Sequence, residues 1–295
     1  MLNARSWQAG ALGVFLALVG TSTVGAQPVG DPGDIGSELW AWGWAGYKGQ
    51  NLVLGQSKYG PVVTQMNDLS GRGNHFFANS QYQPAYATSL ELPSSTKGGA
   101  YQTSLPVVGL DSYADGSNVY GNVMYQNRTL NAAGGFYLAA VCMNTRNGGT
   151  RQLFGSTNGD VVHLDQGLDA VFMTVGGQWR RLCPDGDLPK GIMVLEIWRD
   201  SKGVMTCFAN GNKVTQGTVK TTKTSQISGF GFDGSGSSQW DDYSMEFVMC
   251  DALPPKSERD MIREYLRAKW NVWGAPSPPK AVITPASAIA STTVT

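Results

Sequence analysis

The sequence predicts an all-β domain closed by a single helix near its C-terminus. Gly accounts for 38 of the 295 residues and aromatic residues for 10%, a composition typical of strands with bulky side chains joined by many turns. Only residues 253–270 carry apolar side chains at convincing helical spacing. One sandwich domain with tails is expected, because β sandwiches of roughly 200–250 residues fold as single units.

The charge of the chain argues against a polyanionic partner. Lys and Arg total 22, Asp and Glu total 22, and charged residues make up only 15% of the chain. Proteins that bind nucleic acid or anionic membrane carry a basic patch or excess, which this balance does not provide. Neither partner is expected.

Residues 1–36 are expected to form a signal-like apolar segment followed by an extended arm. Arg5 precedes an apolar stretch at residues 11–19, and small residues at 24–26 suit a signal peptidase. The stretch is too short to span a bilayer, so no membrane is expected around the mature protein. Cleavage after Ala26 and retention of the segment both stay open. Residues 27–36 are so rich in Pro and Gly that no regular element is predicted there.

The domain itself begins near Ser37 with a strand that carries three tryptophans. Trp40, Trp42 and Trp44 alternate with small residues, which predicts that all three indoles share one face. That face is either part of the core, which we favour, or a platform for stacking sugars. Further antiparallel strands are predicted at residues 135–143, 191–198, 204–208 and 243–250, with tight turns at 200–203 and 210–211.

The helix follows the last strand after Pro254 and Pro255, with Ser257 as its expected N-cap. Its apolar face should pack on the sheet, and its charged residues should lie outside. The apolar set is Met261, Ile262, Tyr265, Leu266 and Trp270, and the outer set is Arg263, Glu264, Arg267 and Lys269. Residues 275–295 contain one charge and many Pro, Ala, Ser and Thr, which indicates a low-complexity arm.

Four separate motifs in order resemble the concanavalin A-like lectin/glucanase superfamily, in particular the laminin-G-like domains of bacteriophage virion and bacterial surface proteins. Trp40 is followed by Asp-Leu-Ser-Gly-Arg-Gly-Asn-His at residues 68–75 and Gln-Pro-Ala-Tyr at 83–86. The last strand then leads through 246–253 to Glu-Tyr-Leu-Arg-Ala-Lys-Trp at 264–270. The resemblance covers residues 37–274. It implies a two-sheet antiparallel jelly-roll sandwich in which the loop at 68–75 lies close to the last strand.

Across this superfamily the functions are mostly carbohydrate binding, adhesion and structural display, with some glycosidases. The glycosidases of the fold usually carry two catalytic acids on one strand, because glycoside hydrolysis needs a pair of carboxyl groups about the scissile bond. No such motif occurs, and Glu196 with Asp200 is the nearest approach. We therefore expect a protein that is not an enzyme.

The expected function is that of a structural or adhesive jelly-roll protein, first of all a bacteriophage virion component with glycan as a candidate ligand. The alternatives are a secreted bacterial carbohydrate-binding module and a divergent glycoside hydrolase. The expected location is a virion or the extracellular surface. The expected partners are other virion or surface proteins, contacted through the terminal arms of an oligomer or assembly subunit.

Candidate ligand-binding side chains are aromatic residues in polar, loop-like sequence together with neighbouring amides and acids, since sugar sites combine these groups. They are Tyr82, Tyr86, Tyr120, Asn122, Trp240 and Asp242.

Calcium is the one candidate cofactor, because some members of the superfamily combine the early Asp loop with an acid of the closing strand. The ligands would be Asp68, Asn74 and Glu246; the alternative is that Asp68 and Asn74 cap their own turn. Zinc is not expected, because no His or Cys residues have ligand spacing. Disulfide bonds among Cys142, Cys183, Cys207 and Cys250 stay open.

Overall fold

The structure is a computed structural model that describes most of the predicted domain. The described residues are 30–36, 38–44, 46, 51–57, 60–78, 83–92, 99–109, 113–115, 118–120, 124–144, 150–156, 160–231 and 243–272. The predicted C-terminal arm at 275–295, and most of the segment predicted at 1–36, lie outside them. Within the described part, none of the helices has the length and apolar character needed to cross a membrane.

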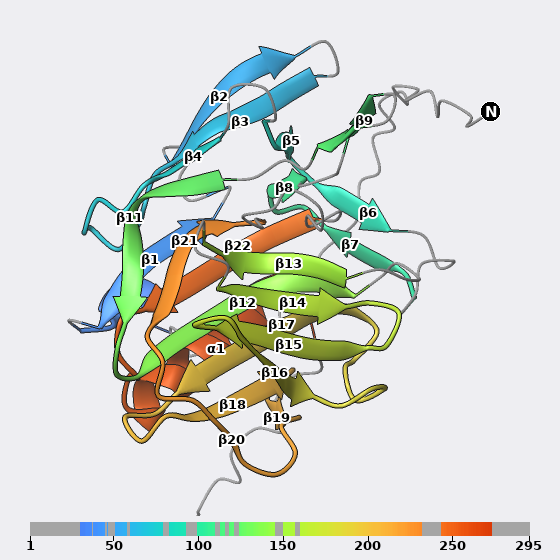
Figure 1. Ribbon diagram of the computed structural model, residues 1–295. Coiled ribbons are helices and arrows are strands. Elements are labelled where there is room, and N and C mark those ends of the chain that lie inside the picture. Colours follow the sequence, from blue (N-terminus) through green and yellow to red (C-terminus); the bar gives the residue numbers. More distant parts are fainter. Residues whose placement is uncertain are drawn as a thin grey trace, which may run out of the picture.

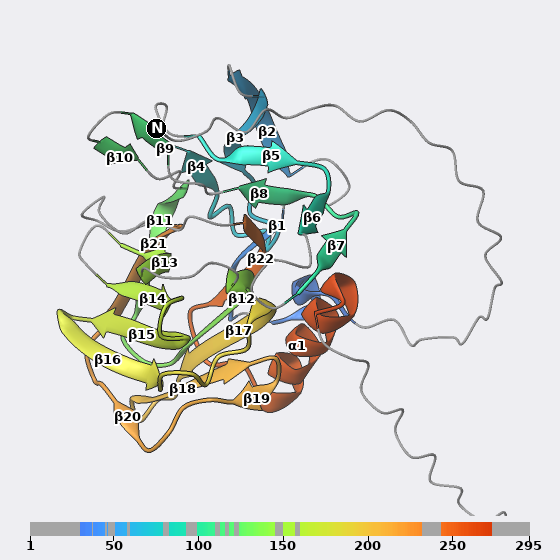
Figure 2. The same cartoon turned by 90° about the vertical axis from the view of Figure 1, so that its right-hand side faces the viewer.

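Antiparallel strands form two facing layers (Figures 1 and 2). We call the first layer the helix-covered sheet. In hydrogen-bonded order it contains β1 (Leu39–Trp44), β22 (Tyr243–Cys250), β12 (Phe136–Asn144), β17 (Gly191–Arg199) and β18 (Val204–Ala209). The short strands β19 (Asn212–Lys213) and β20 (Val219–Lys220) pair with β18, and β8 (Val107–Gly109) pairs with β22.

The second sheet faces the first across the main core. In hydrogen-bonded order it contains β2 (Leu52–Ser57), β3 (Gly60–Met66), β4 (Phe76–Ala78), β11 (Met124–Ala132), β21 (Ser225–Phe230), β13 (Thr150–Gly155), β14 (Val161–Asp165), β15 (Ala170–Val175) and β16 (Gln178–Cys183).

Three smaller pieces complete the strand set. The two sheets are linked through β5 (Ala85–Ala87), which pairs with both β3 and β8. Two separate hairpins are formed by β6 (Leu90–Leu92) with β7 (Tyr101–Thr103), and by β9 (Tyr113–Asp115) with β10 (Asn118–Tyr120).

The core between the sheets explains why β12 and β17 have no polar face. Along β12, Leu138, Ala140 and Cys142 point into the inter-sheet core, while the alternate residues face the helix. Phe247 lies at the centre of this core, with its ring centroid 4.8 Å from Phe76 and 4.7 Å from Phe230. The predicted two-sheet antiparallel jelly-roll sandwich with one helix is confirmed.

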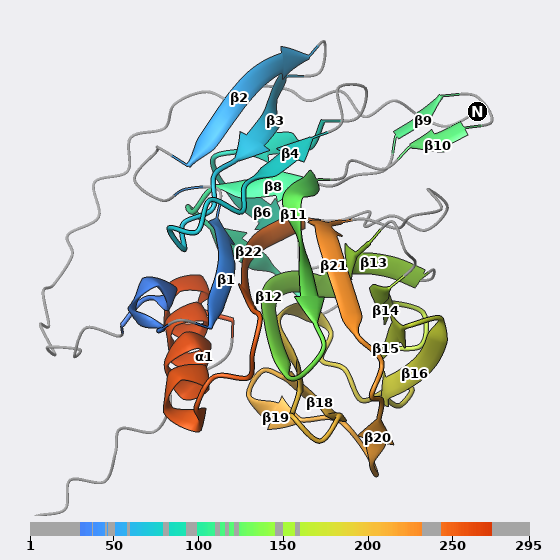
Figure 3. The ribbon, with the colours of Figure 1, turned by 60° about the vertical axis from the view of Figure 1, so that its left-hand side comes forward.

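Helix α1 (Lys256–Trp270) covers the outer face of the helix-covered sheet (Figure 3). Ile262, Leu266 and Trp270 are buried there against alternate residues of β12 and β22. The helix starts two residues earlier than predicted: Pro255 occupies the N-cap position without a side-chain cap, and Ser257 lies inside the first turn. Its C-terminus is closed by Asn271 in the left-handed conformation (φ 48°).

Two predictions about the N-terminal part are wrong. The three tryptophans do not share a face, because a bulge in β1 at Trp40 shifts the register with β22. Trp40 therefore packs on the inter-sheet core, and Trp42 and Trp44 face the helix. Residues 30–36 are not without regular structure either, because η1 (Pro32–Asp34) forms one 3₁₀ turn with a capping box at Asp31.

The four cysteines are all buried and none is bonded to another. Cys142, Cys183 and Cys207 lie in the inter-sheet core, and Cys250 lies under the helix. Burial raises the pKa of the Cys183 thiol to about 12. The thiols therefore behave as small apolar side chains.

Candidate functional site

The loop at residues 68–75 is built around the buried carboxylate of Asp68. Its Oδ1 accepts the backbone N–H groups of Trp42 (3.0 Å) and Ser70 (2.9 Å). Its Oδ2 accepts the Ser70 hydroxyl (2.6 Å) and the Asn74 N–H (3.0 Å). Because a carboxylate has about four lone-pair positions, the protein itself fills all of them.

The same loop also supplies a hydrogen bond to the backbone carbonyl of Trp40, at the bulge in β1. The Asn74 amide donates to the Trp40 carbonyl at 2.7 Å, and the Ser70 hydroxyl lies 3.2 Å from the same oxygen. Arg72 forms an ion pair with Asp251 just beyond β22, with 2.9 Å between Nη1 and Oδ2. The loop at 68–75 and the last strand are therefore adjacent, as the resemblance implies.

Glu246 on β22 is the second fully bonded carboxylate. Its Oε1 accepts Trp42 Nε1 (2.8 Å) and the Tyr265 hydroxyl (2.9 Å), and its Oε2 accepts Trp270 Nε1 (2.6 Å). The Lys269 ammonium lies 2.8 Å from Oε2. Burial lowers the pKa of Lys269 to about 8, against the opposing effect of Glu246. Glu246 is only 1% exposed, so the helix and β1 enclose its carboxylate and the groups bonded to it.

These bonds bear on the calcium prediction. Trp42 connects Asp68 and Glu246, with its backbone N–H on one carboxylate and its indole N–H on the other. Asn74 Oδ1 is buried without a hydrogen-bond partner, so one oxygen of the predicted ligand set is available. Nowhere in the described ranges do three or more His, Cys, Asp or Glu residues cluster so as to hold a metal ion. The contacts of Asp68 match the alternative interpretation, a carboxylate that caps its own turn, and calcium at these residues stays a prediction.

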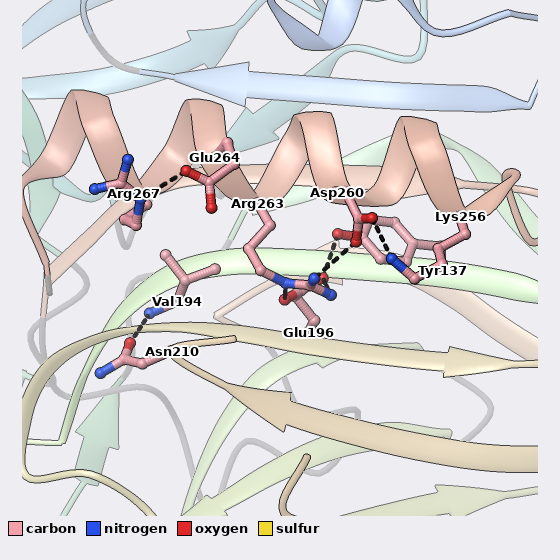
Figure 4. Close-up of polar contacts among 9 residues, drawn as sticks. All are labelled: Tyr137, Val194, Glu196, Asn210, Lys256, Asp260, Arg263, Glu264 and Arg267. Atoms are coloured by element: carbon pink, nitrogen blue, oxygen red, sulfur yellow. Dashed lines mark hydrogen bonds and ion pairs between the residues drawn. The ribbon is translucent and has the colours of Figure 1, made fainter. Parts of the chain in front are cut away.

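A third buried carboxylate, Glu196 on β17, is held by the helix (Figure 4). Arg263 donates Nε to Oε1 at 2.5 Å and Nη2 to Oε2 at 3.0 Å, and the Tyr137 hydroxyl donates to Oε2 at 2.9 Å. Asp260, one turn earlier on α1, accepts from Arg263 Nη1 at 2.9 Å. Burial raises the pKa of Glu196, with Arg263 acting in the opposite direction.

Glu196 and Glu246 lie on the same face of the helix-covered sheet, on the two strands that flank β12. Glu196 is opposite Ala139, and Glu246 is opposite Val141. Both are covered by α1 and at most 1% exposed. They do not face each other across an open groove, so their chemistry is to anchor the helix on the sheet.

The predicted ligand-binding residues are mostly outside the described part of the chain. Tyr82, Asn122, Trp240 and Asp242 lie outside it, and only the backbone of Tyr120 is described, in β10. Tyr86 lies on β5 opposite Val108 and is partly buried against the inter-sheet core. These residues stay predictions as a ligand site.

A different aromatic surface lies on the second sheet, where His163, Phe172 and Trp179 are in ring contact. The strands that carry it, β14, β15 and β16, lie side by side in Figure 2. We call it the Trp179 platform, formed by His163 (β14), Phe172 (β15), Trp179 and Arg181 (β16). Trp179 is 56% exposed, more than any other large hydrophobic side chain in the described ranges. Its ring stacks on Phe172, with centroids 4.5 Å apart and an interplanar angle of 28°. One face of the indole is therefore supported while much of the remaining surface is open to solvent.

The surroundings of Trp179 hold it in place. The His163 ring centroid is 5.5 Å from it, and the guanidinium of Arg181 lies 4.9 Å from the Phe172 centroid. Arg181 also forms an exposed ion pair with Asp185 at 3.0 Å. The platform thus combines a fixed aromatic face with polar groups at its rim, the arrangement that carbohydrate sites use.

Sequence reasoning missed this platform, although a signal was present. Gly176 and Gly177 have φ values of 53° and 72°, which is the two-residue hairpin that paired glycines favour. A hairpin at this point places Trp179 opposite Thr174, and Arg181 opposite Phe172, on one face. The glycine pair followed by Trp179 could therefore have predicted a strand with an exposed indole.

No family model and no curated protein matches the chain. Solved structures match at low identity. One is an arabinofuranosidase complexed with arabinofuranosyl-α-1,2-xylobiose, with 12% identity, a TM-score of 0.46, and coverage of 71% of this chain and 51% of that one. Another is the ligand-binding domain of botulinum neurotoxin serotype D in complex with N-acetylneuraminic acid, with 11% identity, a TM-score of 0.41, and coverage of 79% and 52%.

The receptor-binding domain of a botulinum neurotoxin C/D mosaic matches with 12% identity and a TM-score of 0.37, covering 73% of this chain and 51% of that one. The chain thus spans about half the length of these structures. The expectation that the protein is not an enzyme is corrected, because the matching structures include two α-L-arabinofuranosidases in addition to the arabinofuranosidase named above. The missing pair of acids on one strand does not exclude a catalyst.

Proposed function

We propose that this protein binds carbohydrate and that the Trp179 platform is the surface that contacts the sugar. The observation that carries the proposal is the exposed indole of Trp179, stacked on the buried Phe172. Covering the exposed apolar face of this ring with a ligand would lower the free energy, because it removes apolar surface from water. The apolar face of a pyranose or furanose ring fits such a surface, and its hydroxyl groups can bond to polar groups at the rim.

The rigidity of the platform supports the same proposal. Trp179 is fixed between His163 and Phe172 before any ligand arrives, so little side-chain entropy is lost on binding. Arg181 adds donors in a planar fork that suits vicinal hydroxyl or carboxylate oxygens. Trp179 should therefore contribute most of the binding free energy, as single aromatic residues do in other interfaces.

The test is a glycan microarray of the full chain, followed by calorimetric titration of the best ligand against two variants. Trp179→Ala should weaken binding by about 2 kcal/mol, or roughly 30-fold. Leu168→Ala, which removes another exposed apolar side chain (44%) from the turn before β15, should change the affinity less than about twofold. Absence of binding to every glycan, or equal affinities of the two variants, would refute the proposal. Release of reducing ends by wild type that is lost in Trp179→Ala and kept in Leu168→Ala would indicate that hydrolysis depends on the same surface.

We further propose that glycan binding serves attachment, with the protein acting as a structural or adhesive subunit. A bacteriophage virion is the first candidate, and a secreted bacterial carbohydrate-binding module is the alternative. The order of the superfamily motifs across residues 37–274 supports this reading. Mass spectrometry of the native protein separates the two, because a chain starting at Gln27 indicates secretion and an intact N-terminus indicates retention.

A further inference from the structure

The strand β2 is an edge without protection. It pairs with β3 on one side, and within the described part of the chain no strand pairs with its other side. Natural edge strands are blunted by charges, prolines or a covering element, since their unpaired N–H and C=O groups accept another chain. β2 has the sequence Leu-Val-Leu-Gly-Gln-Ser, which contains no charge and no proline.

The sheet around this edge is apolar as well as open. Val53, Gln65 and Phe77 lie in one row across β2, β3 and β4. Val53 is 47% exposed, Leu54 46% and Phe77 39%. These strands together carry no charged residue, and β2 with β3 extends away from the rest of the molecule (Figure 1). An exposed apolar edge of this kind marks an interaction site.

The chain itself carries a segment of matching chemistry. Residues 281–295 contain no charged side chain and are Val, Ile or Thr at 282–284, 289 and 292–295. Their one proline, Pro285, leaves residues 286–295 as an uninterrupted stretch that can pair as a strand. The segment is joined to the end of α1 by residues 271–280, which reach at most about 36 Å when fully extended. Helix α1 and β2 lie in opposite parts of the molecule (Figure 3), which favours delivery of the segment to a neighbouring copy over folding back.

We propose that the free edge of β2 binds residues 281–295 of a second copy as an added antiparallel strand. The backbone N–H and C=O groups of β2 would supply the hydrogen bonds. Val53 and Leu54, both exposed on β2 itself, would contact the apolar side chains of the incoming strand. An uncharged strand on an uncharged edge loses little to desolvation, whereas a charged partner would be disfavoured. Repeated from copy to copy, such a contact is heterologous and builds a ring or an open chain.

The test measures self-association of the full chain by analytical ultracentrifugation over a range of concentrations. Wild type should associate, and Val53→Lys in β2 should weaken association at least about tenfold, as lysine does on natural edges. Thr292→Pro should have the same effect, because proline removes a backbone donor from the added strand. Two matched controls, Leu168→Lys on an exposed turn and Ser277→Pro in the spacer, should stay within about twofold of wild type.

Three outcomes would overturn the proposal. A chain that stays monomeric throughout has no such contact. Association weakened by Val53→Lys but unaffected by Thr292→Pro would mean that two β2 edges pair directly. Association unaffected by Val53→Lys would place the contact elsewhere. Circular dichroism of each variant confirms that the sandwich remains folded, and addition of a free peptide of residues 281–295 should dissociate the wild-type assembly.

Discussion

Replacing Arg263 by methionine should destabilise the fold far more than the loss of an exposed ion pair. Glu196 is 0% exposed, and Arg263 supplies two of its three hydrogen bonds in a bidentate geometry. The variant leaves the carboxylate buried with only the Tyr137 hydroxyl as a donor. Breaking a buried pair from one side costs about 3–5 kcal/mol, whereas an exposed pair contributes about 0–1 kcal/mol.

A double-mutant cycle separates the uncompensated charge from the lost contacts. Glu196→Gln removes the charge and keeps an acceptor for Tyr137. Combined with Arg263→Met, it should destabilise by only about 1–2 kcal/mol, the cost of the missing hydrogen bonds. The coupling free energy between the two sites is then at least about 2–3 kcal/mol in magnitude, because any cost of Glu196→Gln alone adds to it. Chemical denaturation of the four proteins in urea gives each free energy of unfolding, with a constant m-value as the check for two-state behaviour.

Two results would refute this reasoning. If Arg263→Met lies within about 1 kcal/mol of wild type, the carboxylate does not depend on the helix for its charge. If the double variant is as unstable as the sum of the single variants, the two side chains act independently. A destabilisation of 3–5 kcal/mol should be visible in a thermal scan as a drop of about 6–20 °C for a domain of this size.

Three further predictions follow from the buried groups. The difference in free energy of unfolding between wild type and Arg263→Met should narrow as the pH falls from 7.5 to about 5. Burial raises the pKa of Glu196, so the folded variant takes up a proton that the unfolded chain does not. A difference that stays constant in urea titrations would contradict this. Asp68→Ala should lower the free energy of unfolding by about 2–4 kcal/mol, because the groups that donate to this carboxylate lose their acceptor. EDTA should leave the melting temperature of wild type unchanged. A rise in melting temperature on adding calcium that Asp68→Ala abolishes would instead establish the metal site. Gly43→Ala should destabilise the fold by about 1–3 kcal/mol, because the added Cβ would lie 2.3 Å from the Phe247 ring. Gly134→Ala is the control: it has open space around the new Cβ and should be nearly neutral in the same unfolding assay.

Local patterns in the sequence predicted the elements well and their orientations less well. The apolar spacing of the last helix predicted the buried Ile262, Leu266 and Trp270, since a stripe at period 3.6 leaves few alternatives. The same pattern placed Arg263 and Lys269 on the outside, which is wrong. Both side chains reach carboxylates on the sheet, and nothing local in the sequence pairs Glu196 with a residue 67 positions away.

The alternation of the N-terminal tryptophans failed for a related reason. A period of two holds only while the ladder is regular, and the bulge at Trp40 turns that indole to the opposite face. The bulge is stabilised by the side-chain amide of Asn74, which donates to the Trp40 carbonyl from 34 residues later in the chain. The motif at 68–75 was recognised correctly as a turn, but its role as the support of β1 depends on tertiary contacts.

The two buried carboxylates also explain how α1 finds one position on the sheet. Glu196 and Glu246 are two strands apart, about 9.6 Å sideways, and offset by two residues, about 7 Å along the strands, which gives a separation near 12 Å. Their partners on the helix, Arg263 and Trp270, are two turns apart, about 10.5 Å of rise. The spacings agree for a helix that crosses the strands diagonally. A shift of the helix by one residue would rotate both partners by about 100° and leave two buried charges without donors. The apolar stripe therefore supplies most of the affinity of the helix for the sheet, and the carboxylates select its register.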